Sequence, residues 1–85
     1  MYVIVVYDVS VERVNKVKKF LRQHLHWVQN SVFEGEVTRA EFERIREKIR
    51  ELINEDEDSV VIYKLRSMPE RKIIGLEKNP LEDII

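Results

Sequence analysis

The chain has 85 residues, of which 36% are charged, and its formal net charge is −1. A chain of this length forms one domain, and the absence of cysteine excludes disulfides and thiolate zinc sites. No apolar run is long enough to cross a membrane and no signal-peptide pattern precedes the first predicted strand, so we expect a soluble cytoplasmic protein. The many Lys, Arg and Glu residues favour a thermophilic source, and the small size favours a dimer.

The charges are segregated along the chain. Residues 12–25 hold five basic side chains against one acid, residues 36–58 hold nine acids against five bases, and residues 64–72 are again basic. Separate basic stripes can bind a polyanion even in a nearly neutral protein. The alternative is that they are ordinary solvated helix faces.

The first predicted element is a strand over residues 2–8, in which an apolar run precedes one carboxylate, Asp8. Such a run predicts a strand that is covered on both faces or flanked by strands on both sides. Asp8 then lies at the carboxyl end of the strand. There it is either a turn residue that accepts backbone hydrogen bonds or a ligand of a hard divalent cation such as Mg²⁺.

A helix is predicted to follow, with Ser10 as its N-cap and its end near His24. Its apolar stripe repeats every three or four residues: Val11, Val14, Val17, Leu21 and Leu25. Arg13, Lys16, Lys19 and Arg22 fall largely off this stripe, so the exposed side of the helix is cationic.

Residues 26–37 are rich in β-branched and aromatic side chains and predict two short antiparallel strands with a turn or bulge near Gln29–Ser31. Gly35 indicates a twist or a close backbone approach. Thr38 and Glu41 form a capping box for a second helix that ends near Asn54. The acidic loop 55–58 has no apolar anchor, and we assign it no site.

Residues 59–66 predict the last clear core strand, and Lys72–Gly75 predict a short extra strand. Three of the last five residues are apolar, which suggests that the C-terminal segment 67–85 docks on a second subunit. The order β–α–β–β–α–β favours a ferredoxin-like α+β sandwich, with both helices on one face of a four-stranded antiparallel sheet. In that order the first strand is central, and a partner subunit is the natural cover for the open face.

Few other residues suggest chemistry. His24 and His26 lack an accompanying acid–nucleophile set, and helix-end histidines commonly complement the dipole. Trp27 and Phe33 are of the type that stacks on bases, but isolated aromatics in strands are usually core residues. One aspartate is not a metal site, whereas two copies of Asp8 on a dimer axis could hold an ion that activates water against a phosphodiester.

Several stretches resemble the CRISPR-associated Cas-two family: Tyr-Asp-Val-Ser after the first strand, Asn15-Lys16-Val17, Trp-Val-Gln-Asn-Ser-Val-Phe-Glu-Gly from Trp27, and Asp58-Ser-Val-Val-Ile-Tyr63. The resemblance implies a homodimer in which both Asp8 residues share a Mg²⁺ or another divalent cation such as Mn²⁺. It also implies an endonuclease on RNA or double-stranded DNA that takes part in spacer acquisition. Arg13, Lys16 and Ser31 are then candidate nucleic-acid contacts, with Asp8 as the catalytic residue.

Two other functions remain open from the sequence. The chain could be a structural adaptor that holds duplex DNA and docks the CRISPR integrase without catalysis. It could also be a small regulatory domain that binds a metabolite. A steep fall of nucleic-acid affinity with salt would argue against the metabolite, because metabolite binding releases no counterions from a polyanion.

Overall fold

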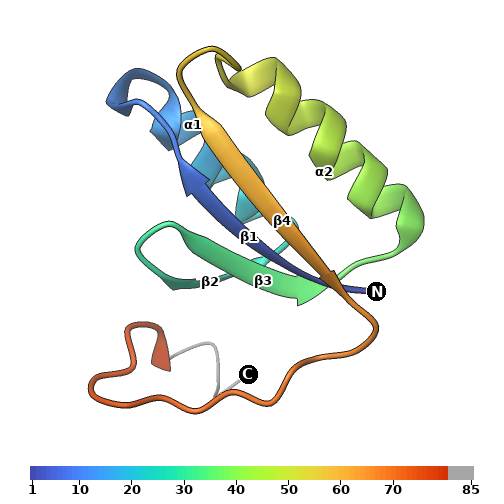
Figure 1. Cartoon of the computed structure of the whole chain (residues 1–85), viewed down its shortest axis with the longest axis vertical. Helices are drawn as coiled ribbons and strands as arrows, with labels where there is room; N and C mark the ends of the chain where they lie inside the picture. The colour runs from blue at the N-terminus through green and yellow to red at the C-terminus, as the bar shows by residue number, and fades with distance from the viewer. Residues whose placement is uncertain (81–85) are drawn as a thin grey trace.

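Strand β1 (Tyr2–Asp8) lies between β3 (Val32–Glu36) and β4 (Ser59–Leu65), and β2 (His26–Gln29) pairs with the outer side of β3. The computed structural model describes residues 1–80. All strand pairs are antiparallel, and helices α1 (Val11–Leu21) and α2 (Arg39–Leu52) cover one face of the sheet (Figure 1). The predicted ferredoxin-like α+β sandwich, with its first strand inside the sheet, is confirmed.

The core forms where alternate residues of β1 face the helices. Val3, Val5 and Tyr7 are buried there, and they share one cluster with Val17, Leu21, Leu25, Phe33, Val37, Ile45 and Ile49. Burying an apolar side chain of this size contributes about 1.5–3 kcal/mol. Ile4, Val6 and Asp8 point to the opposite face, where Val6 is still 37% exposed. The apolar run is therefore flanked on both sides, but it is not fully covered on both faces.

Helix α1 differs from the sequence prediction at both ends. Ser10 is the N-cap residue, but its side chain makes no capping hydrogen bond, and Val11 is exposed. The helix ends at Leu21 rather than near His24, because the Gln23 and His24 amides donate to carbonyls three residues back, the tighter pattern that often closes a helix.

The predicted hairpin between β2 and β3 is present. Asn30 has a φ of 40°, a left-handed conformation that asparagine tolerates in turns, and the strand register shifts between Trp27 and Gln29. A Cβ on Gly35 would lie 3.1 Å from the Leu25 side chain, so the expected close approach at this glycine is also observed.

Helix α2 follows its sequence signals closely. The Thr38 hydroxyl accepts a hydrogen bond from the Glu41 amide, and the Glu41 carboxylate accepts one from the Thr38 amide, both at 3.0 Å. Ile45 and Ile49 are buried against the sheet. Within residues 1–80 neither helix is long and apolar enough to span a membrane.

The C-terminal part departs from the prediction. Residues 72–75 form no strand, and β4, predicted as a core strand, is the edge of the sheet. A strand needs a hydrogen-bonding neighbour, and this segment instead crosses its own sheet, where Arg71 pairs with Glu34 and the Asn79 amide donates to the Trp27 carbonyl. The prediction for the apolar tail, 81–85, falls outside the described residues.

Candidate functional site

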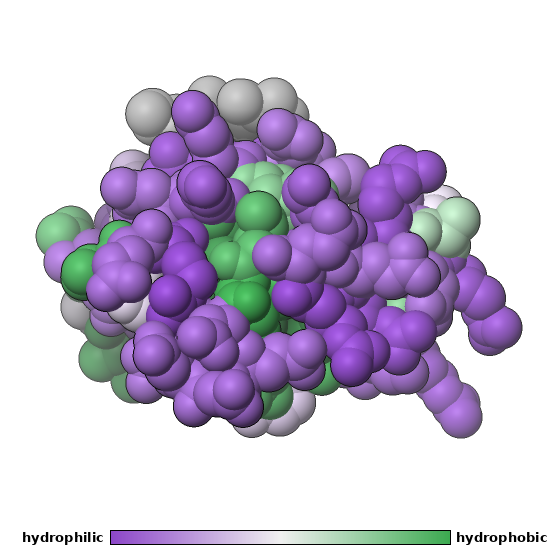
Figure 2. All heavy atoms as spheres, turned by 90° about the horizontal axis from the view of Figure 1, so that it is seen from above, coloured by the Kyte–Doolittle hydropathy of each residue, from purple (hydrophilic) through white to green (hydrophobic). Residues whose placement is uncertain are grey.

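The carboxyl end of β1 meets three other segments at one end of the sheet. Asp8 lies opposite Ser59, the first residue of β4, and the Tyr7 amide donates to the Ser31 carbonyl in the β2–β3 turn. Helix α1 begins three residues after Asp8. Viewed from above Figure 1, the surface is mostly hydrophilic around a central apolar area, with further apolar areas at its margin (Figure 2). The fold thus brings Asp8 and Ser31 to the same end of the sheet, at a surface that suits a charged ligand.

The Asp8 side chain is exposed, and no hydrogen bond or ion pair formed among residues 1–80 involves its carboxylate. The turn-residue alternative requires Asp8 to accept backbone N–H groups, and within the described chain it does not. Both carboxylate oxygens therefore face solvent at the end of a rigid, interior strand. This is the state in which a carboxylate can bind a cation or a water molecule.

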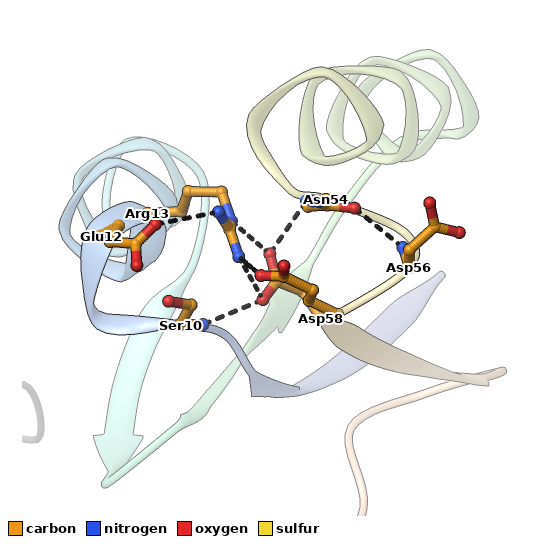
Figure 3. A network of polar contacts seen from close by, with 7 residues as sticks. Ser10, Glu12, Arg13, Asn54, Asp56 and Asp58 are labelled. Carbon is orange, nitrogen blue, oxygen red and sulfur yellow. Dashed lines mark hydrogen bonds and ion pairs between the residues drawn. The ribbon is translucent and has the colours of Figure 1, made fainter.

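A second aspartate at this end, Asp58, is in the opposite state (Figure 3). Its side chain is 1% exposed and accepts four hydrogen bonds. One oxygen accepts the Ser10 amide at 2.9 Å and Arg13 Nη2 at 3.1 Å, and the other accepts Arg13 Nε at 2.6 Å and the Asn54 amide at 2.9 Å. Four bonds use the acceptor capacity of a carboxylate, so Asp58 cannot also serve as a metal ligand.

The bidentate pair fixes the charges of both partners. The hydrogen bonds from Arg13 hold the pKa of the Asp58 carboxyl well below its usual range, and those to Asp58 and Glu57 raise the pKa of the Arg13 guanidinium. Arg13 also binds Glu57 at 2.8 Å. Its donors therefore face carboxylates, and a phosphate would have to share or displace them.

Lys16 lies one turn after Arg13 on α1, and it is exposed. Residues three apart lie on one side of a helix, so Lys16 extends the cationic face in the direction away from Asp8. Of the four predicted site residues, the fold gathers Asp8 and Ser31, ties Arg13 to the adjacent loop, and leaves Lys16 as a free surface cation within the described chain.

A single chain supplies little else for a metal. Residues 1–80 contain no group of three His, Asp or Glu side chains that could hold an ion. Mg²⁺ needs few protein ligands and keeps several waters, so one free oxygen-donor carboxylate per chain fits half of such a site. His24 packs against the Phe20 ring, with centroids 5.0 Å apart.

A further polar cluster, on the open face of the sheet, was not anticipated from the sequence. The Glu34 carboxylate is buried and accepts both the Tyr2 hydroxyl at 2.8 Å and Arg71 at 3.1 Å. Burial and this hydrogen bond raise the pKa of the Tyr2 phenol. Arg71 lies 37 residues after Glu34, and no local pattern signals so distant a pair.

Comparisons with known proteins agree with the resemblance seen in the sequence. The family model described as CRISPR associated protein Cas2 matches residues 1–73. The CRISPR-associated endoribonuclease Cas2 of Thermococcus kodakarensis is 82% identical over 85 residues, and the alignment covers 100% of each chain. The protein of the same name from Pyrococcus furiosus is 73% identical, again over 100% of each chain.

Solved structures agree on the fold. A crystal structure of a Cas2 protein has a TM-score of 0.84 at 45% identity, covering 94% of this chain and 92% of its own. The crystal structure of Streptococcus pyogenes Cas2 at pH 6.5 has a TM-score of 0.71 at 41% identity, covering 76% of this chain and 86% of its own.

Proposed function

Because the chain belongs to the CRISPR-associated Cas2 family, we propose that it is a metal-dependent endonuclease that cleaves RNA. Its relatives are named endoribonucleases. The observation that carries the proposal is Asp8, an exposed carboxylate without a partner in the described chain, at the end of a strand that the core holds in place.

Asp8 of two subunits would hold Mg²⁺, or another divalent cation such as Mn²⁺. When bound, such an ion polarises a phosphoryl oxygen and lowers the pKa of an attacking water. The chain itself contributes the orientation of Asp8 through the pairing of β1 with β3 and β4. It also excludes Asp58 from the site, because that carboxylate is fully hydrogen-bonded.

The active form is proposed to be a homodimer. The open face of the sheet exposes a patch formed by Val6, Val61 and Tyr63, with exposed fractions of 37%, 44% and 57%. An exposed apolar patch on the uncovered face of a sheet favours a partner surface. Residues 67–85 of each chain are proposed to extend the contact by docking on the partner subunit. Arg71 and Asn79 hold part of this segment on its own sheet, and the exposed Ile74 and Leu76 would face the partner.

RNA is proposed to bind along the cationic side of α1 and the β2–β3 turn, through Arg13, Lys16 and Ser31. Contacts of this kind go to the phosphate backbone and carry no sequence information. Within residues 1–80 Lys16 has no partner, so it can contact a phosphate directly. The guanidinium of Arg13 is bound to Asp58 and would have to share its donors with a phosphate. The proposed location is the cytoplasm.

The second candidate is a non-catalytic role in spacer acquisition, in which the dimer holds duplex DNA and docks the CRISPR integrase. It is favoured by the absence, within residues 1–80, of any group of three His, Asp or Glu side chains that could hold a metal ion. The fold would then act as a rigid spacer, and Asp8 would be dispensable.

Cleavage assays with Asp8→Asn separate the two candidates. The nuclease proposal predicts that this variant loses Mg²⁺-dependent cleavage of single-stranded RNA by at least about 100-fold, because the ion supplies several kcal/mol of transition-state stabilisation. Its affinity for the same RNA in EDTA should be unchanged. Equal cleavage by wild type and variant, at equal purity, would remove the nuclease proposal and leave the adaptor.

A further inference from the structure

We infer that Asp58 and Arg13 are positioning residues for Asp8, an inference that rests on the proposed nuclease function. Asp58 lies outside the proposed metal site and contacts neither the ion nor the RNA, whereas Arg13 is also a proposed RNA contact. Their role is to fix the β1–α1 connection, residues 9–10, and with it the direction in which Asp8 leaves the sheet.

The connection is closed by one hydrogen bond across the ends of two strands. Asp8 is the register partner of Ser59, and two residues later the Ser10 amide donates to Asp58 at 2.9 Å. Asp58 immediately precedes Ser59. A short ring therefore joins β1 and β4 at the point where β1 ends, and it restrains the backbone at Ser10.

Asp58 is itself held by two helices. Arg13, in the first turn of α1, binds both oxygens of Asp58, and the amide of Asn54, just after α2, binds one of them. The Asp58 carboxylate is almost fully buried and the Arg13 side chain is 21% exposed, so the bidentate pair is partly shielded from water and from salt. The β1–α1 connection is thus tied to α1, α2 and β4 through a single side chain.

Asp8 needs this support because it has none of its own. Within the described residues its carboxylate makes no hydrogen bond, so its direction depends on the backbone that carries it. Catalytic groups act when they are held within about 0.5 Å of the productive geometry. The network supplies that constraint and leaves both Asp8 oxygens available.

The test uses Asp58→Asn in the full-length protein, with Asp56→Asn as the matched control. Asp56 is an exposed acid of the same loop, and its carboxylate takes no part in the network. Asp58→Asn places an amide donor against the N–H donors of Arg13 and Asn54. We expect its kcat for RNA to fall about 10- to 100-fold with KM nearly unchanged, as for outer partners that orient a metal ligand. Asp56→Asn should match wild type.

A second readout does not depend on activity. Amide hydrogen exchange at Ser10 should become faster in Asp58→Asn, while exchange at Val5 in the middle of β1 stays slow. Should Asp58→Asn fail to fold, Arg13→Lys keeps the charge but loses the bidentate geometry, and it should show the same local change to a smaller degree.

The possible results distinguish a failure of the positioning role from a failure of the proposed nuclease function. If Asp8→Asn abolishes cleavage while Asp58→Asn leaves kcat and Ser10 exchange unchanged, the positioning role is wrong and the nuclease proposal stands. If cleavage does not require Asp8, the nuclease proposal is wrong, and positioning of a catalytic Asp8 is wrong with it. An equal fall of kcat in Asp56→Asn would also overturn the positioning role.

Discussion

Asp8 and Asp58 lie at the same end of the sheet, and their surroundings give them different chemistry. Asp58 is buried, bonded to Arg13 and to two backbone amides, and cannot accept a further ligand. Asp8 is exposed and has no partner within the described chain. One carboxylate therefore stabilises the fold, and the other is available for a cation.

The depressed pKa of Asp58 predicts an acid-sensitive fold. An unfolded Asp titrates near about pH 3.9, above the folded value, so the unfolded chain takes up the proton first as pH falls. The contribution of Asp58 is complete above about pH 5 and is lost progressively below it. Asp58→Asn should therefore be less stable at neutral pH, and its free energy of unfolding should fall less steeply below about pH 5.

Urea denaturation at a series of pH values measures this slope. Asp56→Asn serves as the control, and it should keep the wild-type pH dependence. An identical acid slope in wild type and Asp58→Asn would contradict the role assigned to the Arg13 pair.

The sequence singled out Asp8 as a candidate site residue but could not distinguish Asp58 from its neighbours. Asp8 stands alone after an apolar strand, and that isolation is a local signal. Asp58 is the last of four consecutive acids, which look alike until the fold shows that Asp58 binds both Arg13 and the Ser10 amide, whereas Glu57 binds Arg13 alone. The pairing spans 45 residues, so local spacing carries no information about it.

At the scale of elements, the N-termini of α1 and α2 are capped in different ways. Thr38 caps α2 with its own side chain, and its amide donates the reciprocal bond to the Glu41 carboxylate. Ser10 occupies the N-cap of α1 without a side-chain bond, and Asp58 binds its amide instead. The α2 cap is made by residues three apart in the sequence, whereas the α1 cap depends on Asp58, 48 residues away from Ser10.

This difference predicts unequal effects of alanine at the two caps. Thr38→Ala should lower the free energy of unfolding by about 1 kcal/mol, the usual cost of losing a capping hydroxyl. Ser10→Ala should change it by less than about 0.5 kcal/mol, because only the backbone of Ser10 is engaged. Urea titrations of both variants check the contrast, and a larger loss for Ser10→Ala would contradict it.

Element prediction succeeded where local signals agree with the tertiary contacts. The capping box and apolar period located α2, and the β2–β3 hairpin followed from its turn residues. The extra strand at 72–75 was wrong, because a β-like composition does not supply a neighbouring strand. The predicted end of α1 was also wrong. After Leu21 the amides of Gln23 and His24 bond to carbonyls three residues back, and the apolar period does not reveal this change.

At the scale of the whole molecule, a sheet with helices on one face leaves its other face exposed. Val6 and Val61 face each other across β1 and β4, with Tyr63 next to them on β4. The proposed homodimer would cover this patch, and two copies would then contribute one Asp8 each to a common site.

Charge on the patch should break the dimer without unfolding the chain. Val61→Glu is expected to weaken self-association at least about tenfold, which corresponds to about 1.4 kcal/mol. Its melting curve at low concentration should remain cooperative, because Val61 is exposed in the single chain. Light scattering across a dilution series measures the shift, and Lys48→Glu on the exposed side of α2 is the control.

Metal-binding stoichiometry tests the central claim, that each chain supplies half of a cation site through Asp8. Titration of the full-length protein with Mn²⁺, followed by electron paramagnetic resonance, should give one bound ion per two chains. Asp8→Asn should abolish that signal, while Asp56→Asn should leave it intact. A site that persists in Asp8→Asn, or the absence of any bound ion in the wild type, would contradict the account.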